Sequence, residues 1–262
     1  RANAIKILAR LLSKFNDIPY AISSINGGSK RNAIAREAEL KLFIESKNIE
    51  KIKKYIEEFK YEYKSEFTPK DPEITISLKQ IEKKSQKVFS DSFTQKILNV
   101  ILAMPHGVIA MSQDIPDLVE TSTNLATVVN ENDAVKIGTS QRSSIESAKK
   151  YIASSVKAVF DLAGGEVTVG DGYPGWKPNM NSEVLMKAKT VYQDLYKNVP
   201  EIKAIHAGLE CGILGGKYPG LDMLSFGPTI EGAHSPDERV NIKDVEKFYD
   251  LLKAILVEFT KN

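Results

Sequence analysis

The hydrophobic positions in the first part of the chain switch between helical and strand-like spacing. Apolar side chains recur every three or four residues over 4–15, which predicts a helix, and again over 49–63. Between these stretches, residues 38–44 alternate between apolar and polar side chains, as half-buried strands do. A strand is also predicted over 20–25, where it would end at Asn26-Gly27-Gly28. The alternation returns over 74–78 and predicts a further strand. The predicted order is therefore α-β-β-α-β.

The same order follows a second time before residue 170. The stretches involved are a helix over 93–104, strands over 125–129 and 135–139, a helix over 143–162 and a strand over 167–169. We therefore interpret residues 1–170 as two successive α-β-β-α-β units, related by the order of their elements and not by sequence identity. A ferredoxin-like sandwich needs one more strand in front of each unit. Residues 74–78 could serve the second unit, whereas the first would need a strand before Arg1, so we expect the chain to lack its natural N-terminal part.

The chain changes character after Gly170. Residues 171–178 are rich in glycine and proline, which is typical of an ordered crossing between domains. The pattern then predicts a helix over 182–196, a strand over 202–207, a glycine-rich turn over 208–220, a short strand over 221–226 and a last helix over 245–259. This alternation suits part of a parallel or mixed sheet. Because 171–262 is short for a complete α/β domain, we expect it to complete a sheet that begins upstream and to leave one edge or face of that sheet without its natural cover.

Charge and composition exclude several classes of protein. The chain carries 36 Lys and Arg against 34 Asp and Glu, and the resulting net charge of +2 is too small to favour nucleic-acid binding. A single cysteine, Cys211, excludes an internal disulfide. We expect no signal peptide, and no apolar run reaches the roughly 20 residues that cross a bilayer. We therefore predict a cytoplasmic protein that binds neither membranes nor nucleic acids.

Two segments in the second part of the chain carry candidate groups for chemistry. His234 lies in the glycine-bearing loop of residues 231–238, where a neutral imidazole could bind zinc. No second histidine stands at metal spacing from it, so a hydrogen-bonded loop histidine is the other interpretation. Residues 206–212 end a predicted strand and open a turn or a helix. Gly208 there would let a ligand approach the backbone, whereas Cys211 is expected to be a buried, inert thiol.

Two segments in the first part of the chain also carry candidates. Residues 26–32 form a turn by composition, and a hairpin turn is the simplest interpretation. Arg142 stands at the end of a predicted strand, directly before a helix cap. Its planar guanidinium could hold a carboxylate through two parallel hydrogen bonds, although a solvated arginine is the commoner outcome. Sequence motifs of nucleotide-binding loops, HExxH metallopeptidases and GxSxG hydrolases do not occur.

Several segments together resemble one enzyme family. In chain order they are Gly27-Gly28, Arg31-Asn32-Ala33-Ile34, Arg36-Glu37, Thr121-Ser122-Thr123-Asn124-Leu125, Gln141-Arg142-Ser143-Ser144, Tyr173-Pro174-Gly175-Trp176, His206–Gly212 and Gly232-Ala233-His234-Ser235-Pro236-Asp237-Glu238. Their order and spacing resemble the aminoacyl-histidine dipeptidases, which belong with the aminoacylase and glutamate-carboxypeptidase-like zinc metallopeptidases. The likeness covers the whole chain and corresponds to the C-terminal part of such an enzyme.

The resemblance implies an α/β fold in two parts. Residues 1–170 would form an α+β lid and dimerisation domain that lacks its N-terminal strand. Residues 171–262 would form the C-terminal half of an α/β catalytic domain. The resemblance further implies a homodimer and two zinc ions bridged by a carboxylate, with a glutamate base that activates a water for attack on the peptide bond of a dipeptide.

Some site residues can be transferred one by one from the resemblance. His234 corresponds to a metal ligand. Asn32 and Arg142 correspond to lid residues that bind substrate, with Arg142 expected at the terminal carboxylate of the dipeptide. Gly208 corresponds to a glycine whose backbone contacts the substrate. The base, the bridging carboxylate and most metal ligands lie upstream in such enzymes, so no catalytic residue is retained here, and the resemblance gives no role to His106.

Two hypotheses about function follow. In the first, the chain is part of a zinc-dependent dipeptidase and is inactive alone, because one ligand cannot hold two zinc ions. In the second, it is a non-catalytic module for dimerisation or peptide binding. The first is favoured, because a pure lid module would need neither His234 nor Gly208.

Overall fold

The structure is a computed structural model that describes residues 1–67, 71–81, 87–131, 133–170, 172–177, 179–203, 210–233 and 237–261. The chain divides into two compact units. Unit 1 consists of residues 1–112, 119–143 and 147–170, and unit 2 consists of residues 113–118, 144–146 and 171–262.

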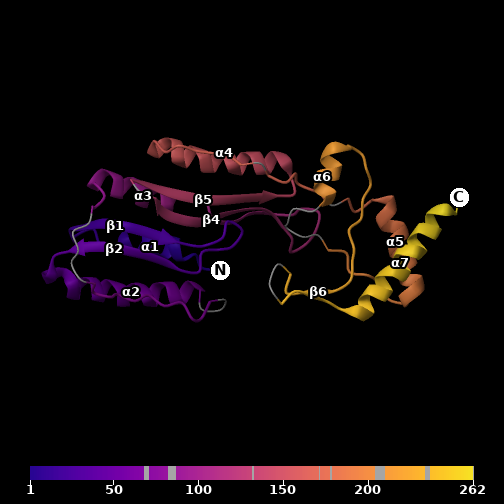
Figure 1. Ribbon diagram of the computed structural model, residues 1–262, viewed down its shortest axis with the longest axis horizontal. Helices are drawn as coiled ribbons and strands as arrows, with labels where there is room; N and C mark the ends of the chain where they lie inside the picture. Colours follow the sequence, from indigo (N-terminus) through magenta and orange to yellow (C-terminus); the bar gives the residue numbers. More distant parts are fainter. Residues whose placement is uncertain are drawn as a thin grey trace. The chain divides into compact units, whose positions relative to one another are not determined.

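Unit 1 contains two groups of strands flanked by helices, first in the order α-β-β-α and then in the order α-β-β-β-α. Its elements are α1 (Ala4–Leu12), β1 (Tyr20–Gly27), β2 (Ala38–Ile44), the 3-10 turn η1 (Ser46–Asn48), α2 (Ile49–Phe67), α3 (Asp91–Ala103), β3 (Gly107–Met111), β4 (Val119–Glu131), β5 (Ala134–Ser143) and α4 (Glu146–Ala163). Figure 1 shows the strands running alongside one another, with the helices packed around them. The predicted α/β class and the order of the main helices and strands are therefore confirmed.

Strand β4 is the central strand of an antiparallel sheet. Strand β5 pairs with it along one side, from Thr121↔Ser143 to Glu131↔Ala134. Strand β3 pairs with the first part of the other side, and β1 meets the same side further along, at Gly27↔Val128. Strand β2 then extends the sheet beyond β1.

One hydrophobic core holds unit 1 together, and all four of its long helices contribute to it. On the central strand, Leu125 and Val128 are fully buried. The N-cap residue of α1, Asn3, is also buried; its side chain accepts hydrogen bonds from the first turn of the helix and donates one to the Leu125 carbonyl, at 2.7 Å. Because the Asn3 side chain bonds both to the first turn of α1 and to the backbone of β4, it fixes the start of the helix against that strand.

Two strands predicted for unit 1 are wrong, and one strand was not predicted. Residues 74–78 and 167–169 do not pair as strands, so the fifth element of each predicted unit is absent. The alternation at 74–78 has another cause, because Ile74 and Ile76 pack on the core and the Tyr63 hydroxyl donates to the Ile74 carbonyl at 2.9 Å. Strand β3 lies in a segment for which no strand was expected.

Unit 2 is built mainly from helices. Its described elements are α5 (Glu183–Tyr196), α6 (Glu210–Lys217), β6 (Ile230–Glu231), β7 (Arg239–Val240) and α7 (Ile242–Thr260). Helix α5 begins at the predicted place because the Ser182 hydroxyl accepts from the Leu185 N–H at 3.0 Å. Helices α5 and α7 pack through a small buried cluster of Ala188, Val191 and Ile255.

The predicted sheet in residues 171–262 is not found among the described residues. There, the only strands are the two-residue pair β6 and β7, and residues 221–226 do not pair as a strand. Of the strand predicted at 202–207, residues 202–203 are irregular and the rest lies outside the described residues. Of the two interpretations of the segment after 206, the helix is confirmed and the turn is wrong where the structure describes it, since residues 210–217 form α6.

Glycines explain why helix α6 forms where a turn was predicted. A Cβ atom at Gly212 would lie 2.7 Å from the Pro174 carbonyl oxygen, and one at Gly215 would lie 2.9 Å from the Met223 Cε. Larger residues would not allow the helix to pack this closely on its neighbours. Close packing here outweighs the low helix propensity of glycine. None of the helices in the described ranges combines the length and apolar character needed to cross a membrane.

Candidate functional site

The loop of residues 28–37 carries Asn32 and packs on the central strand. Gly28, at its start, has a φ of +67°, which few side chains tolerate. A Cβ atom there would lie only 1.9 Å from the carbonyl oxygen of Ala126, at the bulge of β4. The Gly28 N–H donates to the Glu37 carbonyl at 3.0 Å and closes the base of the loop. Glycine is therefore required for the loop to reach β4.

Asn124 of β4 holds the same loop from the side. Its amide nitrogen donates to the Ala33 carbonyl at 2.8 Å, directly after Asn32. Its Oδ1 is buried and has no hydrogen-bond partner among the described residues. A buried acceptor without a partner costs about 1–3 kcal/mol. Asn124 therefore holds the loop through its amide nitrogen, while its amide oxygen stays an unused acceptor.

Arg142 lies on the same face of the sheet as Asn124. On β4, Thr121, Thr123 and Leu125 are buried toward the core, so the alternate positions, which include Asn124, face the other way. Arg142 of β5 stands opposite Ser122, one of these alternate positions. Residues directly opposite each other in an antiparallel pair project to the same face.

The structure therefore brings two predicted site residues to one side of the sheet. Asn32 is exposed on a loop that Asn124 holds, and Arg142 is half-buried on the neighbouring strand. The hydrogen bond from Asn124 and the register of β4 with β5 connect them. The other two predicted residues, Gly208 and His234, lie outside the described residues, as does His206.

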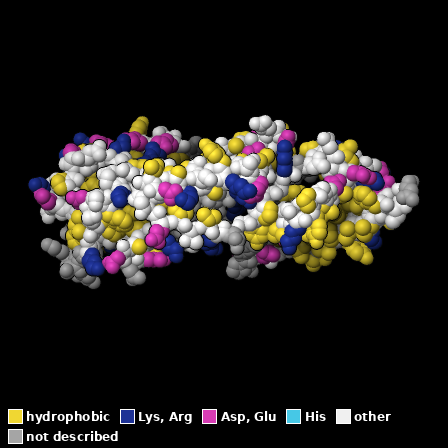
Figure 2. Space-filling model, turned by 90° about the horizontal axis from the view of Figure 1, so that it is seen from above, with side chains coloured by type: hydrophobic (Ala, Val, Ile, Leu, Met, Phe, Trp, Pro, Cys, Tyr) yellow, Lys and Arg dark blue, Asp and Glu magenta, His cyan; other side chains and the backbone are white. Residues whose placement is uncertain are grey.

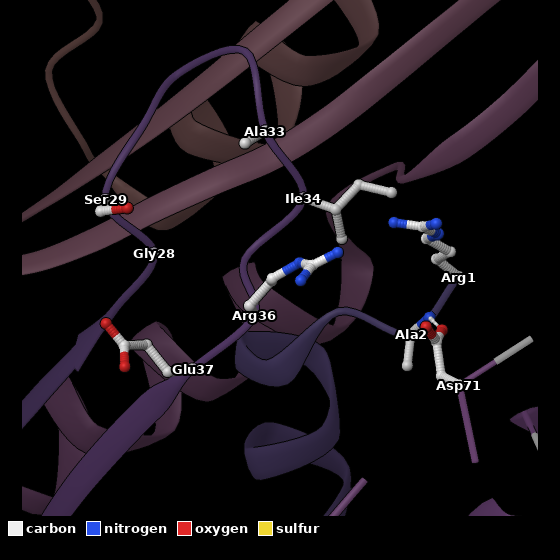
Figure 3. Close-up of a pocket in the computed structure, with 9 residues that line it drawn as sticks. All are labelled: Arg1, Ala2, Gly28, Ser29, Ala33, Ile34, Arg36, Glu37 and Asp71. Atoms are coloured by element: carbon white, nitrogen blue, oxygen red, sulfur yellow. Dashed lines mark hydrogen bonds between the residues drawn. The ribbon is translucent and has the colours of Figure 1, made fainter. Parts of the chain in front are cut away.

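A cavity of about 510 Å³ lies beside the same loop in unit 1. Its wall is formed by Arg1, Ala2, Gly28, Ser29, Ala33, Ile34, Arg36, Glu37 and Asp71. Figure 3 shows the side chains of Ile34, Arg36 and Arg1 converging on it, whereas Glu37 points away. Asp71 accepts a hydrogen bond from the backbone N–H of Ala2 at 2.7 Å. The wall thus carries the side chains of two arginines and of two acidic residues, of which Glu37 is directed away from the cavity.

His106 has a structural position under the central strand. Its Nδ1 accepts a hydrogen bond from the Leu125 N–H at 3.2 Å, which requires that nitrogen to be unprotonated. Burial, and then the positive charge of Lys6, lower the pKa of His106 to about 4. At neutral pH the ring is therefore neutral and serves as a fixed acceptor for the backbone of β4.

This arrangement predicts a loss of stability in mild acid. The pKa of His106 in the folded protein lies below the ordinary value of 6.5. Its contribution to the free energy of unfolding is therefore fully present above pH 6.5 and is lost as the pH falls toward 4. Allowing for solvent around the partly exposed ring, we expect roughly 1 kcal/mol less stability at pH 5 than at pH 7.5. Urea unfolding at the two pH values measures this difference.

The matched control is His106→Asn, whose side-chain oxygen can accept the Leu125 N–H and does not titrate. This variant should lose about 1 kcal/mol less than the wild type between pH 7.5 and pH 5. An equal pH dependence in both proteins would show that the His106 imidazole is not the group responsible.

Cys211 and Glu210, which lie in the segment that also carries Gly208, have the features of structural residues. Cys211 is half-buried in α6, and burial raises the pKa of its thiol, as expected for an inert cysteine. Glu210 is the first residue of the same helix. Within the described ranges, no group of three or more His, Cys, Asp or Glu side chains is placed to hold a metal ion.

Comparison with known proteins relates the chain to dipeptidases. Residues 1–70 match the family described as a peptidase dimerisation domain. The cytosol non-specific dipeptidase of Escherichia coli (strain K12) is 35% identical over 257 residues, which are 98% of this chain and 53% of that protein. The crystal structure of aminoacylhistidine dipeptidase from Vibrio alginolyticus matches with a TM-score of 0.90 and 34% identity, over 98% of this chain and 52% of that one.

A more distant structure shares the fold alone. Aminopeptidase PepT from Bacillus cereus matches with a TM-score of 0.53 and 22% identity, over 64% of this chain and 45% of that one. The chain thus spans about half the length of the dipeptidases it matches. The resemblance found in the sequence motifs is confirmed, including its restriction to part of the enzyme.

Proposed function

We propose that this chain, which is related to the aminoacyl-histidine dipeptidases over 98% of its length, supplies two parts of a zinc-dependent dipeptidase. Residues 1–170 would be the lid, and residues 171–262 the C-terminal half of the catalytic domain. The observation that carries the proposal is the match to a solved aminoacylhistidine dipeptidase at a TM-score of 0.90. That similarity extends through both units of the chain.

The geometry of unit 1 supports a role for the lid in binding substrate. Arg142 would hold the terminal carboxylate of a dipeptide, because its planar guanidinium can donate two parallel hydrogen bonds. Asn32 would donate from the loop to a substrate oxygen. The hydrogen bond from Asn124 to the Ala33 carbonyl supports this, because Asn124 lies on the same face of the sheet as Arg142. Gly208 would contact the substrate through its backbone.

Zinc binding by this chain would rest on His234. The described residues contain no metal-binding cluster, so further ligands would have to come from residues outside the described ranges or from the part of the enzyme that this chain does not span. Zinc, when bound, would supply a Lewis acid and an activated water. We expect the isolated chain to hydrolyse no dipeptide at a measurable rate.

Two further properties belong to the same proposal. A homodimer formed through the lid is supported by the match of residues 1–70 to a peptidase dimerisation domain. A cytoplasmic location is supported by the relative from E. coli, which is named as a cytosol enzyme.

The alternative is a non-catalytic module for dimerisation or peptide binding. The same match of residues 1–70 supports it. The two proposals differ in one respect: only the dipeptidase proposal predicts that the chain hydrolyses dipeptides once it is joined to the rest of the enzyme.

A completed protein tests both proposals. The chain would be joined to the part of the E. coli dipeptidase that its alignment leaves uncovered. The joined protein should bind zinc and hydrolyse dipeptides, and Arg142→Lys should raise KM for a dipeptide by at least about tenfold, the effect of losing roughly 1.4 kcal/mol of binding. Lysine keeps the charge but loses the fork that fits a carboxylate. Zinc content, KM and kcat are the measurements.

Arg10→Lys is the control and should leave KM unchanged. The Arg10 guanidinium pairs with Glu66 on the neighbouring helix, with N–O distances of 2.5 and 2.8 Å. If Arg142→Lys also leaves KM unchanged, Arg142 does not bind the carboxylate. A joined protein that folds and binds zinc but hydrolyses nothing would favour the non-catalytic module.

A further inference from the structure

Strand β4 has a gap in its pairing on one side, and Asn124 lies at the start of this gap. Strand β3 pairs with β4 only before Asn124, and β1 meets the same side only after the bulge. Residues 124–127 therefore have no strand partner there in the described part of the chain. Two side chains take the place of a strand, because the N–H of Leu125 donates to His106 at 3.2 Å and its carbonyl accepts from Asn3 at 2.7 Å. These bonds fix the backbone of β4 beside Asn124.

The loop of residues 28–37 lies against this gap, and Asn124 holds it close to Asn32. At the far end of the loop, the first N–H of helix α1 donates to the Ala35 carbonyl at 2.9 Å. The Nδ2 of Asn124 donates to the Ala33 carbonyl at 2.8 Å. Within the described residues, this is the hydrogen bond nearest to Asn32 that ties the loop to the rest of unit 1. Without it, the backbone next to Asn32 would be held only from within the loop.

Asn124 is not the residue that stability alone would favour at this position. Asparagine is depleted in the interior of strands. Its buried Oδ1 has no hydrogen-bond partner in the part of the chain that the structure describes, and an unpartnered buried acceptor lowers stability. Ala33 is exposed, so water could bond to its carbonyl if the amide were absent. Residues that break a local rule in this way occur at functional sites.

We propose that Asn124 is a positioning residue of the substrate site, which fixes the loop of Asn32 at a cost to the stability of unit 1. The role rests on the function proposed above, in which Asn32 donates to a substrate oxygen. Asn124 would touch no substrate and would act through the backbone of Ala33, directly after Asn32. A small displacement of a donor is enough to weaken its action on a substrate. Removal of the Asn124 amide should therefore reproduce the loss of Asn32.

The isolated chain separates the hold on the loop from stability. Asn124→Val removes both the donor and the unpartnered acceptor, so it should leave Tm unchanged or raise it. Trypsin cleavage after Lys30 and Arg31, which lie in the loop, should become faster by at least about fivefold, because cleavage follows the population of the open loop. Figure 2 shows Lys and Arg side chains spread over the surface, so cleavage at other sites is an internal reference. A marked fall in Tm, or unaltered cleavage after Lys30 and Arg31, would overturn the proposal.

Asn130 of the same strand provides the matched control. Its Oδ1 accepts from the Ile25 N–H at 2.9 Å, so this amide also holds a distant backbone segment, but one in β1. Asn130→Val would leave that donor without its partner. It should lower Tm and leave cleavage in the loop at the wild-type rate. Faster loop cleavage in both variants would show that the loop responds to any change in β4 and would overturn the proposal.

The joined protein described above tests whether Asn124 acts through Asn32. Asn124→Val and Asn32→Ala should each lower kcat/KM for a dipeptide by at least about tenfold, with normal zinc content. The double variant should be no worse than Asn32→Ala alone, because effects do not add when one residue acts through another. Asn130→Val should keep the wild-type kcat/KM. Effects that multiply in the double variant, or a normal kcat/KM in Asn124→Val, would overturn the proposal.

The readouts separate this inference from the proposed function. If the joined wild-type protein folds but hydrolyses nothing, the dipeptidase proposal fails. Trypsin cleavage and Tm of the isolated chain then still decide whether Asn124 fixes the loop at a cost to stability. If the joined protein hydrolyses dipeptides and Asn32→Ala has no effect, the dipeptidase proposal stands and this inference is wrong.

Discussion

In the joined, zinc-loaded protein, His234→Ala should lower kcat/KM for dipeptides by more than about 100-fold. Even residues that only orient a metal ligand cost 10–100-fold in metal affinity or activity when removed. The loss of a ligand itself opens one metal position and leaves the activated water unsupported. Zinc stoichiometry and dipeptide hydrolysis, measured on the same preparation, check the expectation.

His106→Asn is the control for this experiment, because His106 accepts a hydrogen bond within unit 1 and should not affect zinc binding. It should keep normal zinc content and turnover at neutral pH. If His234→Ala also keeps two zinc ions and normal turnover, the assignment of this chain to a dipeptidase active site is wrong.

Gly28→Ala should destabilise unit 1 by roughly 3 kcal/mol. A non-glycine residue at a φ of +67° costs about 1–2 kcal/mol. The added methyl group would also meet the Ala126 carbonyl at 1.9 Å, and relieving such a contact costs about 1–3 kcal/mol more. Urea unfolding measures the loss. In the joined protein the same variant should raise KM, because the loop with Asn32 would move away from β4.

Gly164→Ala separates the two causes. Its φ of +72° is similar, but the added Cβ would meet nothing closer than the Lys96 side-chain nitrogen at 4.0 Å. It should therefore show the backbone cost alone, about 1–2 kcal/mol. Equal losses in both variants would show that the Gly28 loop does not press on β4.

The spacing of apolar residues predicted the helices of this fold better than its strands. Helical stripes reflect contacts along one element, so α5 and α7 begin close to where their stripes predicted. Alternation reports only that one side of an extended segment is buried. At 74–78 the buried side belongs to a segment that packs on the core without pairing as a strand. Strand β3 has only five residues, too few for a clear pattern.

The site could be predicted only in pieces. The motifs pointed to Asn32 and Arg142 separately, and Gly28 was expected in a turn. What joins them is Asn124, which bonds to a loop 91 residues away in the chain. Such a contact joins segments that are distant in the chain, and the spacing of residues within one segment does not report it. The neutral state of His106 likewise follows from its burial beneath β4.

The central position of β4 has a consequence for the order of folding. Its partner β5 begins at Ala134, soon after β4 ends at Glu131, so this hairpin closes at little entropic cost. Strand β1 meets β4 across about 100 residues, and closing a loop of that length costs about 4 kcal/mol. During synthesis, residues 1–70 would leave the ribosome well before the strand that completes their sheet. We expect the β4–β5 hairpin to form first and α1, β1 and β2 to join it afterwards.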